Sequence, residues 1–158
     1  MAPVTFSVAA GFPDAPQQVV LDTATPAATI RYTTDGSTPS TTDGTAIAPG
    51  SSLTVSSTTV LRAVAHRPGW VPSPVETRSH LFTADIVVQD ADPPPGWPDD
   101  NEFNGQDMDY GMDPDVVAGN EAAIEDALLA IPTISIVTDL GNLFDPDDGI
   151  YVNAGERG

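Results

Sequence analysis

The chain has 158 residues, of which 16 are proline, 13 are glycine and 40% are hydrophobic. This composition is typical of one or two small domains made of short elements and many turns, and it disfavours a helical bundle. The 23 acidic and 5 basic residues give a formal net charge of -18, which disfavours nucleic acid and anionic membrane surfaces as partners.

The sequence has no cysteine, which excludes disulfides and thiolate metal sites. It has no apolar run of about 18 residues, so we expect no membrane insertion. The first residues, MAPVTFSVAAGF, lack the basic and apolar regions of a secretory signal. Residues 1–85 contain 6 acids and 4 arginines, whereas residues 86–158 contain 17 acids and only Arg157. This shift predicts a domain boundary near residue 85.

The N-terminal part shows the period-two alternation of an antiparallel β-sandwich, with about six short strands separated by turns. The residues predicted to face inward are Phe6, Val8, Val19, Leu21, Ile30, Tyr32, Leu53 and Val55. Residues 58–66 are apolar on both faces, which indicates a central strand, and residues 75–82 predict the last one. Ile30, Tyr32, Leu61, Ala63 and Ala65 are therefore predicted to belong to the core.

The dipeptide Asp35-Gly36 follows the third predicted strand within the segment ATIRYTTDGSTPS. Glycine tolerates positive φ, and an aspartate side chain can accept hydrogen bonds from nearby backbone N–H groups, so the pair favours a tight turn between strands over a functional site.

The stretches TPAATIRYTTDGSTPS and SSLTVSSTTVLRAVAHRPGWVPSPVETRSHLF resemble the chitobiase/β-hexosaminidase C-terminal domain, also called the fibronectin-III-associated type. The resemblance covers about residues 3–84. It implies an immunoglobulin-like sandwich found in bacterial extracellular proteins. It also implies an accessory module without catalytic residues of its own.

Residues 85–112 are rich in Pro, Asp and Gly, and their three consecutive prolines predict an extended acidic linker. Asp113 is expected to cap a helix with Pro114 at its first position, and a second helix is expected to begin near Asn120. Its apolar face would hold Ile124, Leu128 and Ile131, with Pro132 ending it. Residues 133–139, TISIVTD, then read as a buried strand, so the C-terminal part is predicted to be partial, mostly irregular α/β structure.

The segments YGMDPDVV and ALLAIPTISIVTDLGNLFDPDDGIYVNAGERG are similar to the opening of CotH-like proteins, relatives of a spore-coat protein-kinase family. The resemblance covers about residues 107–158, so that residues 113–158 would be the truncated start of such a domain. The family's nucleotide-binding and catalytic segments lie further downstream. The resemblance therefore implies a piece of a longer protein, and it assigns no catalytic residue here.

Calcium is considered for DPDDGIYVNAGE because Asp145, Asp147 and Glu156 fall at positions 1, 3 and 12 of an EF-hand loop. Gly149 and Ile150 break the rest of that pattern, so an Asp-rich turn is favoured over an EF-hand. A different calcium site remains open, with Asp145, Asp147 and Asp148 as candidate ligands. Asp99, Asp100, Asp107 and Asp109 are further candidates, and no other cofactor is expected.

An enzymatic site finds little support in the sequence. His66 and His80 meet the composition of a catalytic triad, but no G-x-S-x-G motif accompanies them, and both fall on predicted strands beside Arg62 and Arg78. The acidic residues crowd into turn-rich segments instead of a rigid cleft that would suit glycoside hydrolysis.

Carbohydrate binding is the other alternative, because sugar rings stack on exposed aromatic faces. The candidate aromatic residues are Trp70, Tyr32 and Phe12, of which alternation places Tyr32 in the core. For Trp70, the sequence leaves open whether it plugs the end of the sandwich or lies exposed. We therefore expect a non-catalytic accessory or spacer module of an extracellular or cell-surface bacterial protein. Its expected partners are neighbouring domains of a longer chain and, in the binding alternative, a polysaccharide.

Overall fold

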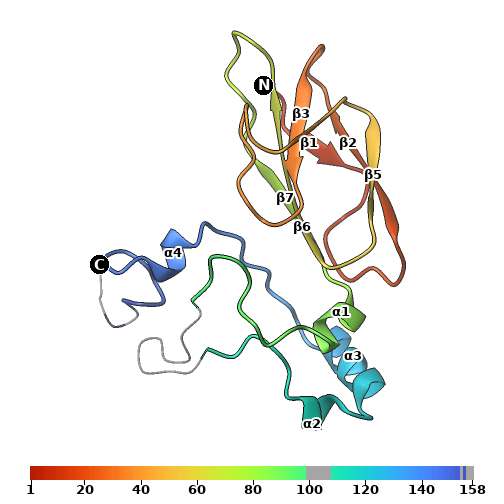
Figure 1. Ribbon diagram of the computed structural model, residues 1–158. Coiled ribbons are helices and arrows are strands. Elements are labelled where there is room, and N and C mark those ends of the chain that lie inside the picture. The colour runs from red at the N-terminus through yellow and green to blue at the C-terminus, as the bar shows by residue number, and fades with distance from the viewer. Residues whose placement is uncertain (99–107, 154, 156–158) are drawn as a thin grey trace. The chain divides into compact units, whose positions relative to one another are not determined.

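The computed structural model describes residues 1–98, 108–153 and 155 of the chain. It divides into two compact units, Met1–Phe82 and Thr83–Gly158, which are described separately. Figure 1 shows strands in the first unit and short helices in the second.

Seven strands form the described part of the first unit: β1 (Val4–Phe6), β2 (Gln17–Thr23), β3 (Thr29–Thr33), β4 (Thr45–Ile47), β5 (Ser51–Val55), β6 (Thr59–His66) and β7 (Glu76–His80). They make two antiparallel sheets, one ordered β1-β2-β5 and the other β4-β3-β6-β7. This confirms the predicted mainly β fold, an immunoglobulin-like sandwich followed by an irregular C-terminal segment. The predicted central strand, β6, pairs with both β3 and β7.

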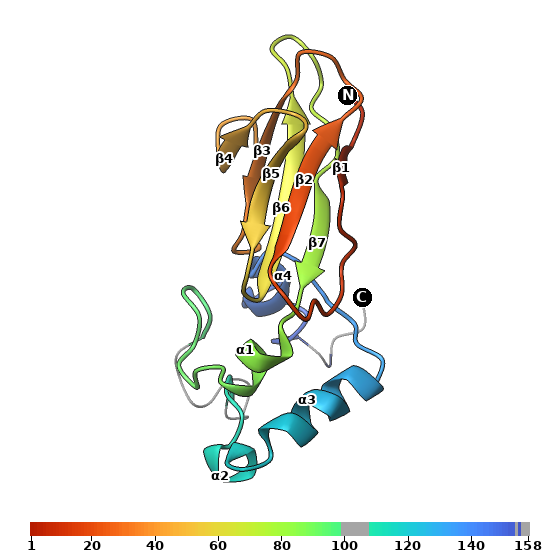
Figure 2. The same cartoon turned by 90° about the vertical axis from the view of Figure 1, so that its right-hand side faces the viewer.

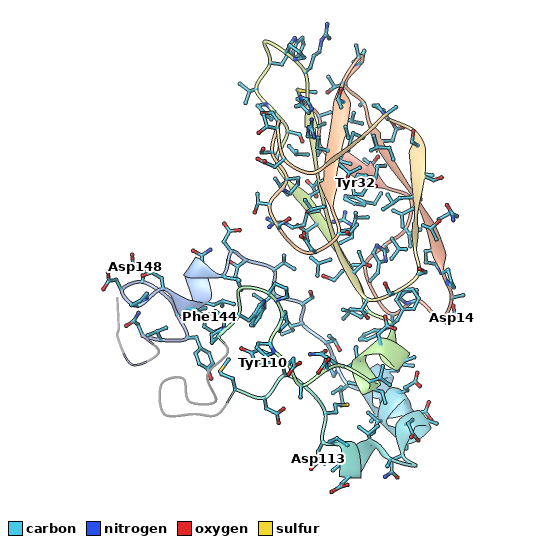
Figure 3. The ribbon with its side chains drawn as sticks, viewed as in Figure 1. Asp14, Tyr32, Tyr110, Asp113, Phe144 and Asp148 are labelled. Carbon is cyan, nitrogen blue, oxygen red and sulfur yellow. The ribbon has the colours of Figure 1, made fainter. Side chains whose placement is uncertain are left out.

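The core lies between the two sheets and follows the alternation of the sequence. Ile30, Leu61, Ala63 and Ala65 are fully buried, while Tyr32 is partly buried and packs against them. Figure 3 shows the position of Tyr32 in the sandwich. The remaining buried members of this cluster are Val4, Val19, Leu21 and Val55. Because side chains alternate between the two faces of a strand, a period-two pattern places these residues on the buried face.

After β1, the chain crosses from the three-stranded sheet to the four-stranded sheet. Gly11 forms a parallel bridge with His80 at the end of β7. The N–H of Gly11 donates to the carbonyl oxygen of Ser79 at 3.0 Å, and the N–H of Leu81 donates to the carbonyl oxygen of Gly11 at 2.9 Å. We call these two hydrogen bonds the Gly11 seam. They join the crossing segment, residues 7–13, to an edge strand that would otherwise lack a partner there.

The second unit contains the helices α1 (Thr83–Val87), α2 (Pro114–Val117), α3 (Glu121–Ala130) and α4 (Gly141–Phe144). The Asp113 side chain accepts from the backbone N–H of Asp115 with Pro114 opening α2, as predicted, and α3 begins after Asn120. The Thr83 hydroxyl on α1 donates to the Glu125 carboxylate on α3 at 2.5 Å. No described helix is long and apolar enough to cross a membrane.

The predicted strand at residues 133–139 is wrong. The structure has neither a helix nor a strand in this segment, and Ile134 and Ile136 are 85% and 79% exposed. Ile131 is also exposed, whereas Ile124 and Leu128 are half-buried. A β-branched sequence favours a strand only when another strand pairs with it, and no described strand does so here.

Composition predicts an extended linker at residues 85–112, and the structure describes residues 85–98 and 108–112 of this stretch. Val87 is buried at the end of α1, and Trp97 packs edge-on against Tyr110 and Phe144, at ring-centroid distances of 5.9 and 5.4 Å. The ring of Phe144 in turn packs against the ring of Tyr151, with 5.7 Å between the two ring centroids. Figure 3 labels Tyr110 and Phe144 in this aromatic cluster. Edge-on aromatic pairs stabilise a fold by more than the buried area alone would, so Trp97 and Tyr110 are packed side chains in the second unit.

Candidate functional site

The Asp35-Gly36 pair lies in a loop that connects β3 to β4. One carboxylate oxygen of Asp35 accepts from the backbone N–H of Ser37 at 3.0 Å and from its hydroxyl at 2.6 Å. These hydrogen bonds stabilise the charged form and lower the pKa of Asp35 below its usual value. The N–H of Gly36 donates to the Val60 carbonyl at 3.2 Å. The pair is a turn, but it belongs to the loop of residues 34–44 and is not the bend of a two-residue hairpin.

Two arginines on the outer face of the four-stranded sheet hold this loop in place. Arg62 donates through Nη1 to the Gly36 carbonyl at 3.0 Å and to the Thr38 hydroxyl at 2.7 Å. Arg31 donates through Nη1 to the Gly44 carbonyl at 2.6 Å. Pro39 is buried in the loop, and Val64 is buried although it points away from the core. The polar groups of the DGSTP segment are thus used to dock a loop on the sheet, and they leave little free for chemistry.

Residues 8–77 match the model of the Chitobiase/beta-hexosaminidase C-terminal domain. That domain is a non-catalytic accessory domain with an immunoglobulin-like fold, in agreement with the two sheets described above. The match covers less than half of the chain and ends before the second unit. No curated protein and no solved structure shows significant similarity to the chain. The CotH-like resemblance of residues 107–158 thus stays a prediction from the sequence.

The two histidines of the first unit lie far apart. His66 pairs with Thr29 at one end of β6, and His80 pairs with Thr59 at the other end. Eight residues of strand, at about 3.3 Å each, separate these ends by about 25 Å. The two side chains also fall on opposite faces of the sheet, because Thr59 and His66 differ in strand parity. They do not converge on a shared reactive pocket.

His80 is the most unusual polar residue of the domain. It is fully buried on the inner face of β7, and neither ring nitrogen has a hydrogen-bond partner among the described residues. Burial lowers the pKa of His80, and the charge of Arg78 lowers it further. The Arg78 guanidinium lies 5.1 Å from the centre of the Phe6 ring and 3.9 Å from the Glu76 carboxylate. A neutral imidazole is the form that this environment favours.

Sequence reasoning missed that β7 turns its polar side chains toward the interior of the sandwich. In residues 75–82, the apolar residues Val75 and Leu81 alternate with Glu76, Arg78 and His80, so hydrophobicity alone suggests the opposite orientation. The pairing of Leu61 with Arg78 decides the face, because Leu61 lies in the core. The register between β6 and β7 therefore determines which side of β7 is buried, and the hydrophobic pattern of β7 alone does not.

Trp70 is exposed, which settles the question that the sequence left open. Its side chain is 56% exposed in the loop between β6 and β7, and its neighbour Val71 is 81% exposed. The backbone N–H of Trp70 donates to the Arg67 carbonyl at 3.1 Å, and the Arg67 guanidinium lies 5.2 Å from the centre of the indole ring. This cation–π pair holds an aromatic surface at one end of the sandwich.

Asp145, the first of the candidate calcium ligands, uses its side chain for backbone hydrogen bonds. One carboxylate oxygen of Asp145 accepts from the N–H groups of Asp147 and Asp148, at 2.9 and 3.1 Å. Among residues 1–98, 108–153 and 155, no three His, Cys, Asp or Glu side chains are grouped to hold a metal ion. Asp109 is among these described residues. The other residues named in the sequence analysis, Asp99, Asp100, Asp107 and Glu156, lie outside them. The geometry supports an Asp-capped turn after α4.

Proposed function

We propose that residues 1–82 are a non-catalytic spacer module of a longer bacterial protein that is exported or displayed at the cell surface. The observation that carries this proposal is the position of the two ends of the domain. The Met1 amino group donates to the Val71 carbonyl at 3.1 Å, at the β6-to-β7 end of the sandwich. Phe82 exchanges hydrogen bonds with Thr58 at 3.0 and 3.3 Å, at the other end of β6.

The chain therefore enters the sandwich at one end and leaves it at the other, as Figure 2 shows for the N-terminus and for β7. The length of β6 gives about 25 Å between these ends. Such an in-line arrangement lets a small domain separate its neighbours by a fixed length. The match to the chitobiase-type domain, which is an accessory domain, supports the same non-catalytic role.

The proposal can be tested by a distance measurement in the full chain. Pro72 and Ser57 are exposed at opposite ends of the sandwich, and the sequence contains no cysteine, so Pro72→Cys with Ser57→Cys gives two unique label positions. Pulsed electron paramagnetic resonance should give one narrow distribution near 25 Å plus the length of the labels. A broad distribution, or hydrolysis of chitooligosaccharides by the chain, would contradict a rigid non-catalytic spacer.

Carbohydrate binding at Trp70 is a second candidate, which the 56% exposure of its side chain favours. A sugar ring would stack on the indole face, with hydroxyl groups near Arg67. The full chain would then be retained in gels that contain soluble chitin derivatives, and Trp70→Ala would abolish the retention. Ile134→Ala, which removes an even more exposed apolar side chain in the second unit, should leave it unchanged.

The remaining alternative is that this chain is the entry segment of a CotH-like atypical protein kinase. It rests on the resemblance of residues 107–158, which the family match does not reach. Calorimetry with ATP and Mg²⁺ would distinguish this alternative, because only a nucleotide-binding unit would release heat on titration. Absence of binding would leave the spacer proposal in place.

A further inference from the structure

The environment of His80 points to a response to acid. Its side chain is fully buried and lacks a hydrogen-bond partner on either ring nitrogen among the described residues. Its backbone lies between Ser79 and Leu81, the two residues of β7 and its continuation that make the Gly11 seam. A charge that appears on this ring would have to be solvated, and the simplest way to admit water is to open the seam beside it.

The charged groups around His80 would not compensate such a charge. On β7 they are Arg78, which repels a second positive charge, and Glu76, which pairs with Arg78 at 3.9 Å. On β6 the opposite residue is Thr59, followed on the same face by Leu61 and Ala63. Neither β1 nor the crossing segment contributes a titratable side chain, and the next acid along that segment is the exposed Asp14.

We propose that His80 is an acid-sensitive latch: protonation of its imidazole releases the crossing segment, residues 7–13, from the end of β7. The direction follows from linkage. The pKa of His80 in the closed sandwich is below the usual 6.5, so the opened form binds a proton first as the pH falls. The seam is therefore fully stable above about pH 6.5 and weakens as the pH decreases toward the lowered pKa.

The composition allows a clean measurement. The chain has 2 histidines and no cysteine, so between about pH 7.5 and pH 5 few other groups change charge. Hydrogen exchange of the full chain, normalised for the intrinsic pH dependence, should show loss of protection at the amides of Gly11 and Leu81. Because one proton is involved, the loss should approach, and not exceed, about tenfold per pH unit between pH 6.5 and the lowered pKa of His80. The amides of the β3–β6 pairing should stay protected.

Two variants separate the latch from a general effect of acid. His80→Leu replaces the ring by a neutral apolar side chain, and its seam amides should be equally protected at about pH 7.5 and pH 5. His66→Gln is the matched control and should behave as the unsubstituted chain. An equal loss of protection in the His80→Leu chain would overturn the proposal.

If His80→Leu does not fold, the unsubstituted chain still provides a test. Nitrogen chemical shifts of the two imidazoles, followed by NMR over the same pH range, report the titration of His80 directly. The latch requires a midpoint below 6.5 that coincides with the loss of seam protection. A midpoint at or above 6.5, or a seam that stays closed after His80 is charged, would refute it.

Discussion

Gly44 packs directly against the backbone of Tyr32: a Cβ at Gly44 would stand 2.8 Å from the Tyr32 carbonyl oxygen. The φ of Gly44 is +94°, which side chains rarely adopt. The loop of residues 34–44 can therefore return to the sheet at β4 only because this position lacks a side chain.

Gly44→Ala should destabilise the first unit by about 2 to 4 kcal/mol, because positive φ and the backbone clash act together. Urea unfolding followed by circular dichroism measures the change. Gly50→Ala is a matched control, since Gly50 also has positive φ, at +78°, but nothing lies within 4 Å of its added Cβ. Its cost should be only about 1 kcal/mol. Equal effects of the two substitutions would show that the close approach to Tyr32 is unimportant.

Arg62→Met should loosen the loop of residues 34–44, because it removes hydrogen bonds to Gly36 and Thr38 while it retains the apolar stem. The expected cost is about 1 to 3 kcal/mol, and hydrogen exchange at Gly36 should accelerate. Thr38→Val removes only one of the two acceptors and should have a smaller effect. Unchanged exchange at Gly36 in Arg62→Met would mean that the Val60 carbonyl holds the loop by itself.

Ser37→Ala should raise the pKa of Asp35 toward 3.8, because the Ser37 hydroxyl is the largest cause of its lowered value. The sign for stability follows: hydrogen bonds to the charged carboxylate stabilise the turn above pH 3.8, and this contribution is lost as the pH falls through the lowered pKa. Carboxyl carbon shifts measured by NMR give both values. Ser40→Ala, which affects the separate Asp43 interaction, should leave the Asp35 titration in place.

Leu61→Ala should cost about 2 to 5 kcal/mol, because Leu61 is fully buried between the sheets and the substitution leaves a cavity. Ile134→Ala should change stability by less than about 0.5 kcal/mol, since the Ile134 side chain is 85% exposed. Chemical denaturation of both variants provides the comparison. A large cost for Ile134→Ala would show that residues 133–139 are buried after all, as the sequence alone suggested.

The core of the sandwich could be predicted because the alternation of apolar and polar residues along a strand indicates which side chains share the buried face. Val19, Leu21, Ile30 and Leu61 follow this rule, and all are buried. The strand β4 could not be predicted in this way, because its three residues are largely exposed and show no alternation. Local pattern is informative only where burial differs between the two faces of a strand.

The environment of His80 was beyond the sequence for a different reason. Its burial depends on the pairing of β6 with β7 and on the return of Gly11 to that edge, contacts between residues far apart in the chain. The unpaired segment at residues 133–139 shows the converse, because its strand propensity is strong but no described strand pairs with it. The burial of His80 and the lack of a strand at residues 133–139 both depend on whether distant segments pair with them, and the local sequence does not specify this.

The parallel direction of the crossing segment and β7 has a mechanical consequence. A pull on the two ends of the sandwich would slide Gly11 and Leu81 past each other in opposite directions, so tension would load their two hydrogen bonds in shear. Bonds loaded in this way must break together, whereas an antiparallel edge would peel open one bond at a time. Since His80 lies between these bonds, acid would lower the force at which the domain yields.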